Sequence, residues 1–248
     1  MVQEKIIEVN NLTASFGNKE VLKGVSFSAY KKEITVIIGG SGSGKSTILN
    51  NLLRLYEPPA NCVKIFNRDV TTLTEEELTR FYIKTGVFFQ NGALLNSLTT
   101  GENIALNLEQ HSNLPSAIIN DIVKMKLKLV NLEDAFNLYP SQLSGGMLKR
   151  AALARAVIMD PPLLFCDEPG AGLDPVSLAN LDQLIIDLRN KMNMTIVMIT
   201  HEVSSIMRIA DKIIFLDKGE IIFEGSPNDA VKSNIKAVED FFGKGRGM

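Results

Sequence analysis

The chain has 248 residues, 45% of them hydrophobic and 22% charged, and its 26 Lys and Arg against 28 Asp and Glu leave a net charge of −2. This composition is typical of a folded globular protein and excludes a largely disordered chain, and the acidic balance argues against nucleic acid as the main partner. No apolar run approaches the roughly 18 residues of a membrane-spanning helix, and the acidic, alternating N-terminus does not resemble a signal peptide.

The N-terminal part of the chain is predicted to form short strands. Residues 4–30 contain alternating stretches such as 25–30, and residues 16–19, Phe-Gly-Asn-Lys, are typical of a turn between two strands. A β-branched apolar run at 33–38 is expected to be a buried strand.

Residues 39–47 read GGSGSGKST and satisfy the phosphate-loop pattern G-x-x-x-x-G-K-[ST]. Because a strand precedes them and a run with helical spacing follows at 48–53, the pattern has the strand-to-helix context of a real site. Glycines let backbone N–H groups turn toward a phosphate, and the helix dipole favours the same anion. We expect Lys45 to reach the β- and γ-phosphates of a nucleotide and Ser46 to bind Mg²⁺. The whole loop is expected to contact the nucleotide: Gly39, Gly40, Ser41, Gly42, Ser43, Gly44, Lys45, Ser46 and Thr47.

The stretch after the helix that follows the phosphate loop is predicted to contain two more strands and a capped helix. The strands are expected at 62–66 and 86–89, and the second ends at Gln90. Thr74 and Glu77 have the spacing of a capping box at a helix start.

From about residue 91 to 160 helical spacing replaces the strand pattern. Helices are predicted at 100–109, 117–130 and 143–159, the last opening at Ser144-Gly145-Gly146. This stretch is interpreted as an all-helical insertion of about 70 residues in a mostly parallel sheet flanked by helices.

Beyond residue 160 the alternation of strand and helix returns. A buried strand at 163–166 ends in Asp167-Glu168, and Asp174 and Pro175 are typical of the N-cap and first residue of a helix. The other expected elements are a helix at 175–191, a strand at 195–199 before Thr200-His201, a hairpin at 212–224 turning at 218–219, and a short helix at 235–242.

The two cysteines, Cys62 and Cys166, lie far apart in apolar surroundings, and we predict reduced core residues of a cytoplasmic protein. The two histidines, His111 and His201, are near neither cysteine, so a cysteine–histidine metal site is not expected.

The pair Asp167-Glu168 is predicted to be the second nucleotide motif. A carboxylate at a strand end beside a phosphate loop can hold Mg²⁺, a role we assign to Asp167. Glu168 is then free to take a proton from an attacking water, and such help is typically worth about 10² to 10⁴ in rate.

Residues 143–150, LSGGMLKR, closely resemble the signature sequence of ATP-binding-cassette (ABC) ATPases, usually written LSGGQ. Ser144, Gly145 and Gly146 would present a hydroxyl, N–H groups and a helix dipole to an anion. The resemblance implies that this anion is the γ-phosphate of ATP held by the phosphate loop of a second copy, so that two chains sandwich two ATP molecules. The implied fold is α/β: a phosphate-loop NTPase (RecA-like) core with a mostly parallel sheet, N-terminal antiparallel strands and an inserted helical subdomain.

Other residues match family features one by one. Gln90 resembles the glutamine that contacts Mg²⁺ and water, and His201 resembles the histidine that touches the γ-phosphate. Residues 171–174, Ala-Gly-Leu-Asp, resemble the loop that contacts the opposite subunit, with Ala171 where Ser is common, and Asp174 is included among the ATP-binding residues. Phe16 resembles the aromatic residue that stacks on adenine, and Val21 is expected beside the base.

The resemblance covers nearly the whole chain and is most specific for the Mla, or Mce-associated, subgroup. Met147, in place of the usual Gln of the signature, matches that subgroup. So do four stretches of the sequence: 90–94, 139–156, 167–175 and 238–243. It implies an ATPase, with ATP and Mg²⁺, that energises lipid movement between bacterial membranes. The implied partners are a second copy, a membrane permease, a periplasmic Mce protein and a STAS-domain protein, without nucleic acid. The implied location is the cytoplasmic face of the inner membrane.

The whole chain is expected to be one nucleotide-binding domain, with its core at about 1–90 and 161–234, a helical subdomain at about 91–160 and a tail at about 235–248. Three alternatives stay open from the residues: an ABC transporter ATPase for another cargo such as an amino acid, metal or lipoprotein; a non-transport ABC ATPase; and a phosphate-loop kinase or GTPase. The last would leave Ser144-Gly145-Gly146 and the helical insertion unexplained.

Overall fold

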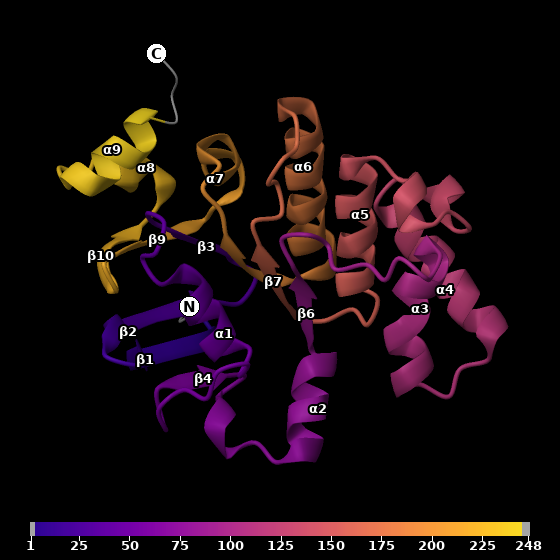
Figure 1. The fold of residues 1–248 in the computed structure, drawn as a ribbon, viewed down its shortest axis with the longest axis horizontal. Helices are drawn as coiled ribbons and strands as arrows, with labels where there is room; N and C mark the ends of the chain where they lie inside the picture. Colours follow the sequence, from indigo (N-terminus) through magenta and orange to yellow (C-terminus); the bar gives the residue numbers. More distant parts are fainter. Residues whose placement is uncertain (1–2, 245–248) are drawn as a thin grey trace.

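A six-stranded sheet runs through the middle of the molecule in the computed structural model, which describes residues 3–244 (Figure 1). Its strand order is β10-β9-β3-β8-β7-β6. The five strands from β9 to β6 are parallel, and β10 pairs antiparallel with β9. Their bounds are β3 (Ile34–Ile38), β6 (Thr85–Phe88), β7 (Leu163–Asp167), β8 (Thr195–Ile199), β9 (Lys212–Asp217) and β10 (Glu220–Gly225).

A second sheet of four antiparallel strands has the order β2-β1-β4-β5. Its strands are β1 (Lys5–Phe16), β2 (Lys19–Tyr30), β4 (Val63–Ile65) and β5 (Arg68–Asp69). The expectation of short strands before residue 30 was wrong, because β1 and β2 are 12 residues each. Register shifts in the β1–β2 pairing, such as that between Val9 and Leu12, interrupt the alternation and make a long strand look like several.

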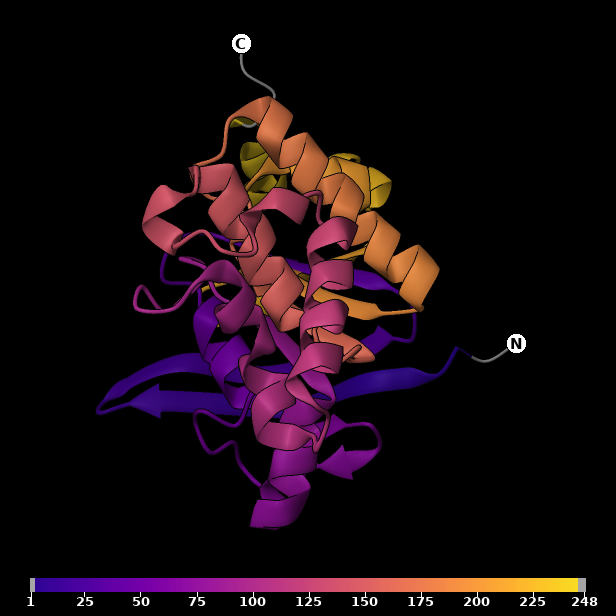
Figure 2. The ribbon, with the colours of Figure 1, turned by 90° about the vertical axis from the view of Figure 1, so that its right-hand side faces the viewer.

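Helices cover the sheets, and those of the middle segment gather beyond β6 (Figures 1 and 2). Their bounds are α1 (Lys45–Leu52), α2 (Glu75–Ile83), α3 (Thr100–His111), α4 (Ser116–Leu129), α5 (Gly145–Ala156), α6 (Pro175–Met192), α7 (Val203–Ile209), α8 (Pro227–Val231) and α9 (Lys236–Lys244), with short 3₁₀ turns at Val70–Thr72, Glu133–Ala135 and Pro140–Gln142. The predicted tail reaches residues 245–248, which lie outside the described residues.

Local capping sets several helix starts. Thr74 and Glu77 form the predicted capping box of α2, and the Asp174 carboxylate accepts the backbone N–H groups of the first turn of α6. The helix predicted at 143–159 ends earlier, at Ala156, because the chain turns at Asp160, with a φ of 51°, ahead of two prolines. Helices α7 and α8 were not predicted, because they are too short to show a clear period in the sequence.

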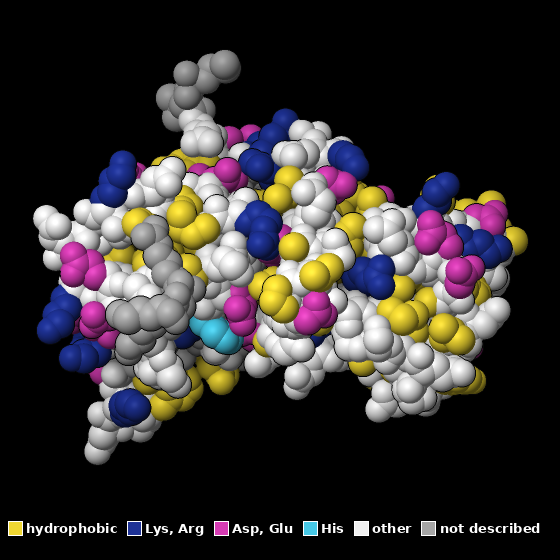
Figure 3. Space-filling model, turned by 90° about the horizontal axis from the view of Figure 1, so that it is seen from above, with side chains coloured by type: hydrophobic (Ala, Val, Ile, Leu, Met, Phe, Trp, Pro, Cys, Tyr) yellow, Lys and Arg dark blue, Asp and Glu magenta, His cyan; other side chains and the backbone are white. Residues whose placement is uncertain are grey.

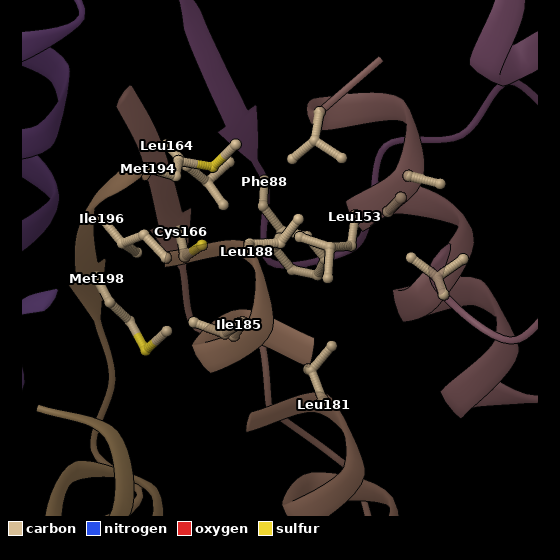
Figure 4. Packing of buried hydrophobic residues seen from close by; sticks show 14 of the residues in the cluster. Phe88, Leu153, Leu164, Cys166, Leu181, Ile185, Leu188, Met194, Ile196 and Met198 are labelled. Carbon is tan, nitrogen blue, oxygen red and sulfur yellow. The ribbon is translucent and has the colours of Figure 1, made fainter. Parts of the chain in front are cut away.

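Two hydrophobic clusters fill the spaces on either side of the parallel sheet. Strand β3 serves both, since Val36 and Ile38 belong to the cluster under the helices while Ile37 belongs to the cluster between the two sheets. Figure 4 shows the first cluster, in which side chains of β7, β8 and α6 meet Phe88 of β6 and Leu153 of α5. The helical segment therefore shares one continuous core with the sheet.

The cysteines and the surface complete the description. Cys166 is fully buried, as predicted, and burial raises the pKa of its thiol. Cys62 is free as well; it is half-buried and packs against the cluster between the two sheets, so its assignment to the core holds only in part. Charges of both signs are interspersed with small hydrophobic patches on the face seen from above in Figure 3. Within residues 3–244, no helix is both long and apolar enough to cross a membrane.

Candidate functional site

The loop between β3 and α1 has a backbone that only glycine allows at two key positions. Gly39 has a φ of 150°, and a Cβ there would lie 2.0 Å from the carbonyl oxygen of Leu216. Gly44 has a φ of 112°, and a Cβ there would lie 2.7 Å from a methyl carbon of Leu22. The loop therefore packs against β9 and β2, while Gly40, Ser41 and Gly42 between these two positions are exposed.

Polar groups gather inside this loop. The Lys45 ammonium donates to the carbonyl oxygens of Gly39 and Gly40, each at 2.9 Å. The Ser43 hydroxyl is buried and has no hydrogen-bond partner among the residues that the structure describes. An unpaired buried hydroxyl is costly unless a ligand satisfies it, which indicates an anion-binding loop.

Asp167 is the last residue of strand β7 and Glu168 follows it; in the sheet, β7 is separated from β3 by β8 alone. Burial raises the pKa of Asp167, the charge of Glu168 raises it further, and Lys45 lowers it. Burial lowers the pKa of Lys45, against the attraction of Glu168 and Asp167. The two acids and the lysine are thus within electrostatic reach of each other, because carboxyl ends of parallel strands meet at one edge of the sheet.

Glu168 and His201 form a pair across two strand ends. The His201 Nδ1 atom lies 2.9 Å from Glu168 Oε1, and the His201 backbone N–H donates to Glu168 Oε2 at 3.3 Å. The hydrogen bond to Glu168 raises the pKa of His201 despite partial burial. Glu168 has a φ of 46°, and its N–H donates to the Ile199 carbonyl at 2.8 Å. This strained backbone aims the carboxylate at the histidine.

Ser144, Gly145 and Gly146 lie at the start of α5, in the helical segment beyond β6, whereas the phosphate loop lies between β3 and α1 (Figure 1). The Ser144 hydroxyl accepts the Met147 N–H at 3.3 Å as the N-cap. Ser144 and Gly146 border a cavity of about 360 Å³ that faces α6 and includes Ser177 and Asp187. The site therefore consists, within one chain, of two separate parts: the loop with its acids, and the start of α5.

Gln90 is exposed just beyond the end of β6, as predicted. Asp174 is the N-cap of α6, as predicted, and its carboxylate oxygen accepts the N–H groups of Val176 and Ser177, each at 3.0 Å. The Ser177 side chain, together with these backbone N–H groups, lowers the pKa of Asp174.

Phe16 lies at the end of β1 with half of its surface exposed. Its ring meets that of Tyr56 edge-on, with centroids 5.4 Å apart, beside an open hollow of about 600 Å³. Val21 is half-buried, and its carbonyl oxygen lies against Gly44 and Gly219. The sequence analysis missed Tyr56, for which no local pattern gave a signal.

Two further residues were missed: Lys149 and Arg155 of α5, which donate to backbone carbonyls of residues 90–93. Their positions in the chain show only that they are basic residues on a helix, so spacing alone could not have found them.

Within the described residues, no group of three or more His, Cys, Asp or Glu side chains is arranged to hold a metal ion. A cation that keeps several water and phosphate ligands, as Mg²⁺ does, needs only one or two protein oxygens. The Ser46 hydroxyl, the Gln90 amide and the Asp167 carboxylate are oxygen donors of the kind that Mg²⁺ prefers.

Comparison with known proteins gives a consistent result. The family model described as "ABC transporter" matches residues 22–171. The intermembrane phospholipid transport system ATP-binding protein MlaF of Haemophilus influenzae is 35% identical over 240 residues, covering 97% of this chain and 91% of that protein.

A second relative and a solved structure extend the comparison. The probable ribonucleotide transport ATP-binding protein mkl of Mycobacterium tuberculosis (strain H37Rv) is 37% identical over 95% of this chain, which spans 66% of the length of that relative. The dimeric post-hydrolysis structure of the ATP-binding cassette MJ0796, bound to ADP and Pi, has a TM-score of 0.80 and 32% identity, covering 89% of this chain and 98% of that one.

Proposed function

We propose that this chain, which belongs to the ABC transporter family and is an ATP-hydrolysing subunit, energises the movement of phospholipid or a related lipid between bacterial membranes. The observation that supports the cargo is the 35% identity to a phospholipid-transport ATPase over 97% of this chain and 91% of that relative. Met147 in the signature stretch and the sequence at 238–243 support the same subgroup.

The phosphate loop is proposed to hold the triphosphate of ATP. Backbone N–H groups and the Ser43 hydroxyl would bind phosphate oxygens, and Lys45 would exchange its two carbonyl partners for the β- and γ-phosphates. Phe16 offers an exposed ring to the adenine, with Val21 beside the base.

Ser46, Gln90 and Asp167 are proposed to hold Mg²⁺. When bound, this ion neutralises charge on the β- and γ-phosphate oxygens. It would also keep Asp167 ionised, against the burial that raises the pKa of that carboxyl.

Glu168 is proposed to take the proton of the attacking water. Its carboxylate is oriented by the Nδ1 atom and the backbone N–H of His201, so the geometry is set before the substrate arrives. With Nδ1 bound to Glu168, the Nε2 atom of His201 is the one left to meet the γ-phosphate.

The second part of the site is proposed to come from another copy of the chain. Ser144, Gly145 and Gly146 lie apart from the phosphate loop of their own chain, and they present a capped helix start to solvent. In a head-to-tail dimer they would bind the γ-phosphate of the partner's ATP. The dimeric state of the ATP-binding cassette MJ0796 supports the presence of a second copy.

ABC ATPases work with a membrane permease, and the segment at 91–160 is proposed to contact it. An Mce-type lipid-binding protein and a STAS-domain protein are the further partners proposed, as in the Mla subgroup. Through the permease the chain would lie on the cytoplasmic face of the inner membrane.

The test is to purify the permease complex through this chain and reconstitute it in vesicles that contain a fluorescent phospholipid. We expect ATP-dependent transfer of the lipid, which the Glu168→Gln variant lacks, and lipid in the purified complex by mass spectrometry. The identity to a relative named for ribonucleotide transport favours one other cargo. Stimulation of the ATPase by ribonucleotides but not by phospholipid would decide for that cargo instead.

A further inference from the structure

Helix α5 touches the segment that carries Gln90 at several successive turns. The Lys149 ammonium donates to the carbonyl oxygen of Gln90 and lies over the Phe88 ring, 5.6 Å from its centroid. One turn and a half later, the Arg155 guanidinium donates to the carbonyl oxygens of Gly92 at 2.8 Å and Ala93 at 2.7 Å. Two cations of one helix thus bind three carbonyl groups of one short loop.

The loop is shaped to make these contacts. Gly92 and Ala93 have φ values of 71° and 51°, which turn their carbonyls toward the helix. A Cβ on Gly92 would lie 3.1 Å from that of Ala152, so the loop backbone rests directly on α5. The hydrogen bond to the Gly92 carbonyl is partly buried, and those to the Gln90 and Ala93 carbonyls are exposed. Hydrogen bonds from charged donors are stronger than neutral ones, so the two cations together hold the loop in one position.

The same helix is firmly attached to the core and begins at the proposed γ-phosphate site. Leu153 and Phe88 are both buried and lie close together in the shared core (Figure 4). At the other end of α5 stand Ser144 and the two glycines. An α-helix of 12 residues is a stiff rod, so a displacement of its first turn is transmitted to Lys149 and Arg155.

We propose that Lys149 and Arg155 are positioning residues that tie the Gln90 loop to α5, so that the position of the Ser144-Gly145-Gly146 turn sets the position of the Gln90 side chain. The proposal rests on the proposed role of Gln90 at Mg²⁺ and water. Neither cation touches the nucleotide; each acts through the loop backbone.

The test compares Lys149→Met, which keeps the aliphatic stem and removes the ammonium, with Lys149→Arg, which keeps a donor. The matched control is Lys124→Met, because Lys124 also lies over an aromatic ring, that of Phe136 at 6.0 Å, but it belongs to α4 and its charged partner is Asp121 at 3.8 Å. We expect Lys149→Met to lower kcat about tenfold, since a small misplacement of a positioning group costs one to two orders of magnitude in rate. The KM for ATP should stay within about twofold. Lys149→Arg should recover most of the rate, and Lys124→Met should leave it unchanged.

Combination with Gln90→Ala separates positioning from a general structural effect. If Lys149 acts through Gln90, Lys149→Met has little further effect on kcat once the amide is gone. An equal loss of kcat in both backgrounds would overturn the proposal. The concentration of Mg²⁺ for half-maximal rate should rise in Lys149→Met and not in Lys124→Met.

Hydrogen exchange tests, without any activity measurement, whether Lys149 and Arg155 hold the Gln90 loop against α5. Amides of residues 89–95 should exchange faster in Lys149→Met and in Arg155→Lys, which loses the two-pronged donor, while the strands of the core stay protected. Unchanged exchange in that segment in both folded variants would overturn the proposal. A wild-type protein that fails to hydrolyse ATP would contradict the proposed function, and the exchange result would still decide whether the tie exists.

Discussion

At the scale of single residues, the charged groups at the strand ends show a division of work. Burial raises the pKa of Asp167, whereas Glu168 is held by two contacts to His201. Two adjacent carboxylates with such different surroundings suit different tasks, one binding a cation and the other accepting a proton.

Glu168→Gln should keep ATP binding and lose turnover. The amide preserves the size and one hydrogen bond of the carboxylate but cannot accept a proton, so we expect hydrolysis to fall by about 10² to 10⁴. The variant should accumulate as an ATP-bound dimer, measured by size-exclusion chromatography with and without ATP. Turnover at the wild-type rate would rule out Glu168 as the base.

The His201 imidazole should titrate above its ordinary value. Its pKa is raised chiefly by the hydrogen bond to Glu168, so NMR titration should place it above 6.5 in the wild type and lower in Glu168→Gln. Because the folded-state pKa is the higher one, the stabilising contribution is complete below pH 6.5 and is lost as the pH rises through the folded value. The imidazole is 60% exposed, so solvent screening keeps this contribution small. An unshifted His201 resonance in Glu168→Gln would contradict the pairing.

At the scale of secondary structure elements, the phosphate loop depends on what it packs against. The turn between β9 and β10 donates the Gly219 N–H to the Ser43 carbonyl at 3.2 Å, and the Leu216 carbonyl lies beside Gly39. The loop is thus held in place by strand β9 and the turn after it. Strand β9 begins at Lys212, which is 173 residues after Gly39 in the sequence.

Gly39→Ala should damage the loop, whereas Gly40→Ala should not destabilise the fold. A methyl at Gly39 would collide with the Leu216 carbonyl and the positive φ is unfavourable, so we expect a loss of more than about 1 kcal/mol and weak nucleotide binding. At Gly40 nothing lies within 4 Å of a Cβ. Thermal unfolding of the two variants makes the comparison, and equal melting temperatures would show that β9 does not constrain the loop.

At the scale of the whole molecule, the core explains how the helical segment is attached. One hydrophobic cluster continues from β3, β7 and β8 through α6 into α3, α4 and α5, so these helices are not an independently packed unit. The attachment places the start of α5 at a distance from the phosphate loop of the same chain. A second copy is therefore proposed to complete each site.

Mixing two inactive variants should restore activity if the sites are shared between chains. Lys45→Ala removes the lysine of the phosphate loop, and Ser144→Arg blocks the start of helix α5. Neither homodimer then has an intact site. A mixed dimer has one, assembled from Lys45 of one chain and Ser144 of the other. We expect at most about a quarter of the wild-type rate in an equal mixture, since half of the dimers are mixed and each has one of two sites. No recovery in mixtures with proven subunit exchange would contradict composite sites.

Features that depend on neighbouring residues could be predicted from the sequence. The phosphate loop, the capping box at Thr74, the Asp174 cap and the turn at 218–219 are all set within a few residues, so local sterics and hydrogen bonds determine them. The family followed from the same motifs in their order along the chain.

Contacts between distant segments were decided only by the tertiary structure. Phe16 meets Tyr56, Glu168 meets His201, and Lys149 binds the carbonyl of Gln90 because the sheet order and the shared core bring their elements together. Each of these contacts joins residues more than 30 positions apart, where no periodic pattern links them. The sequence by itself therefore determined which chemical groups this ATPase possesses, and the packing of its strands and helices decided which of them act together.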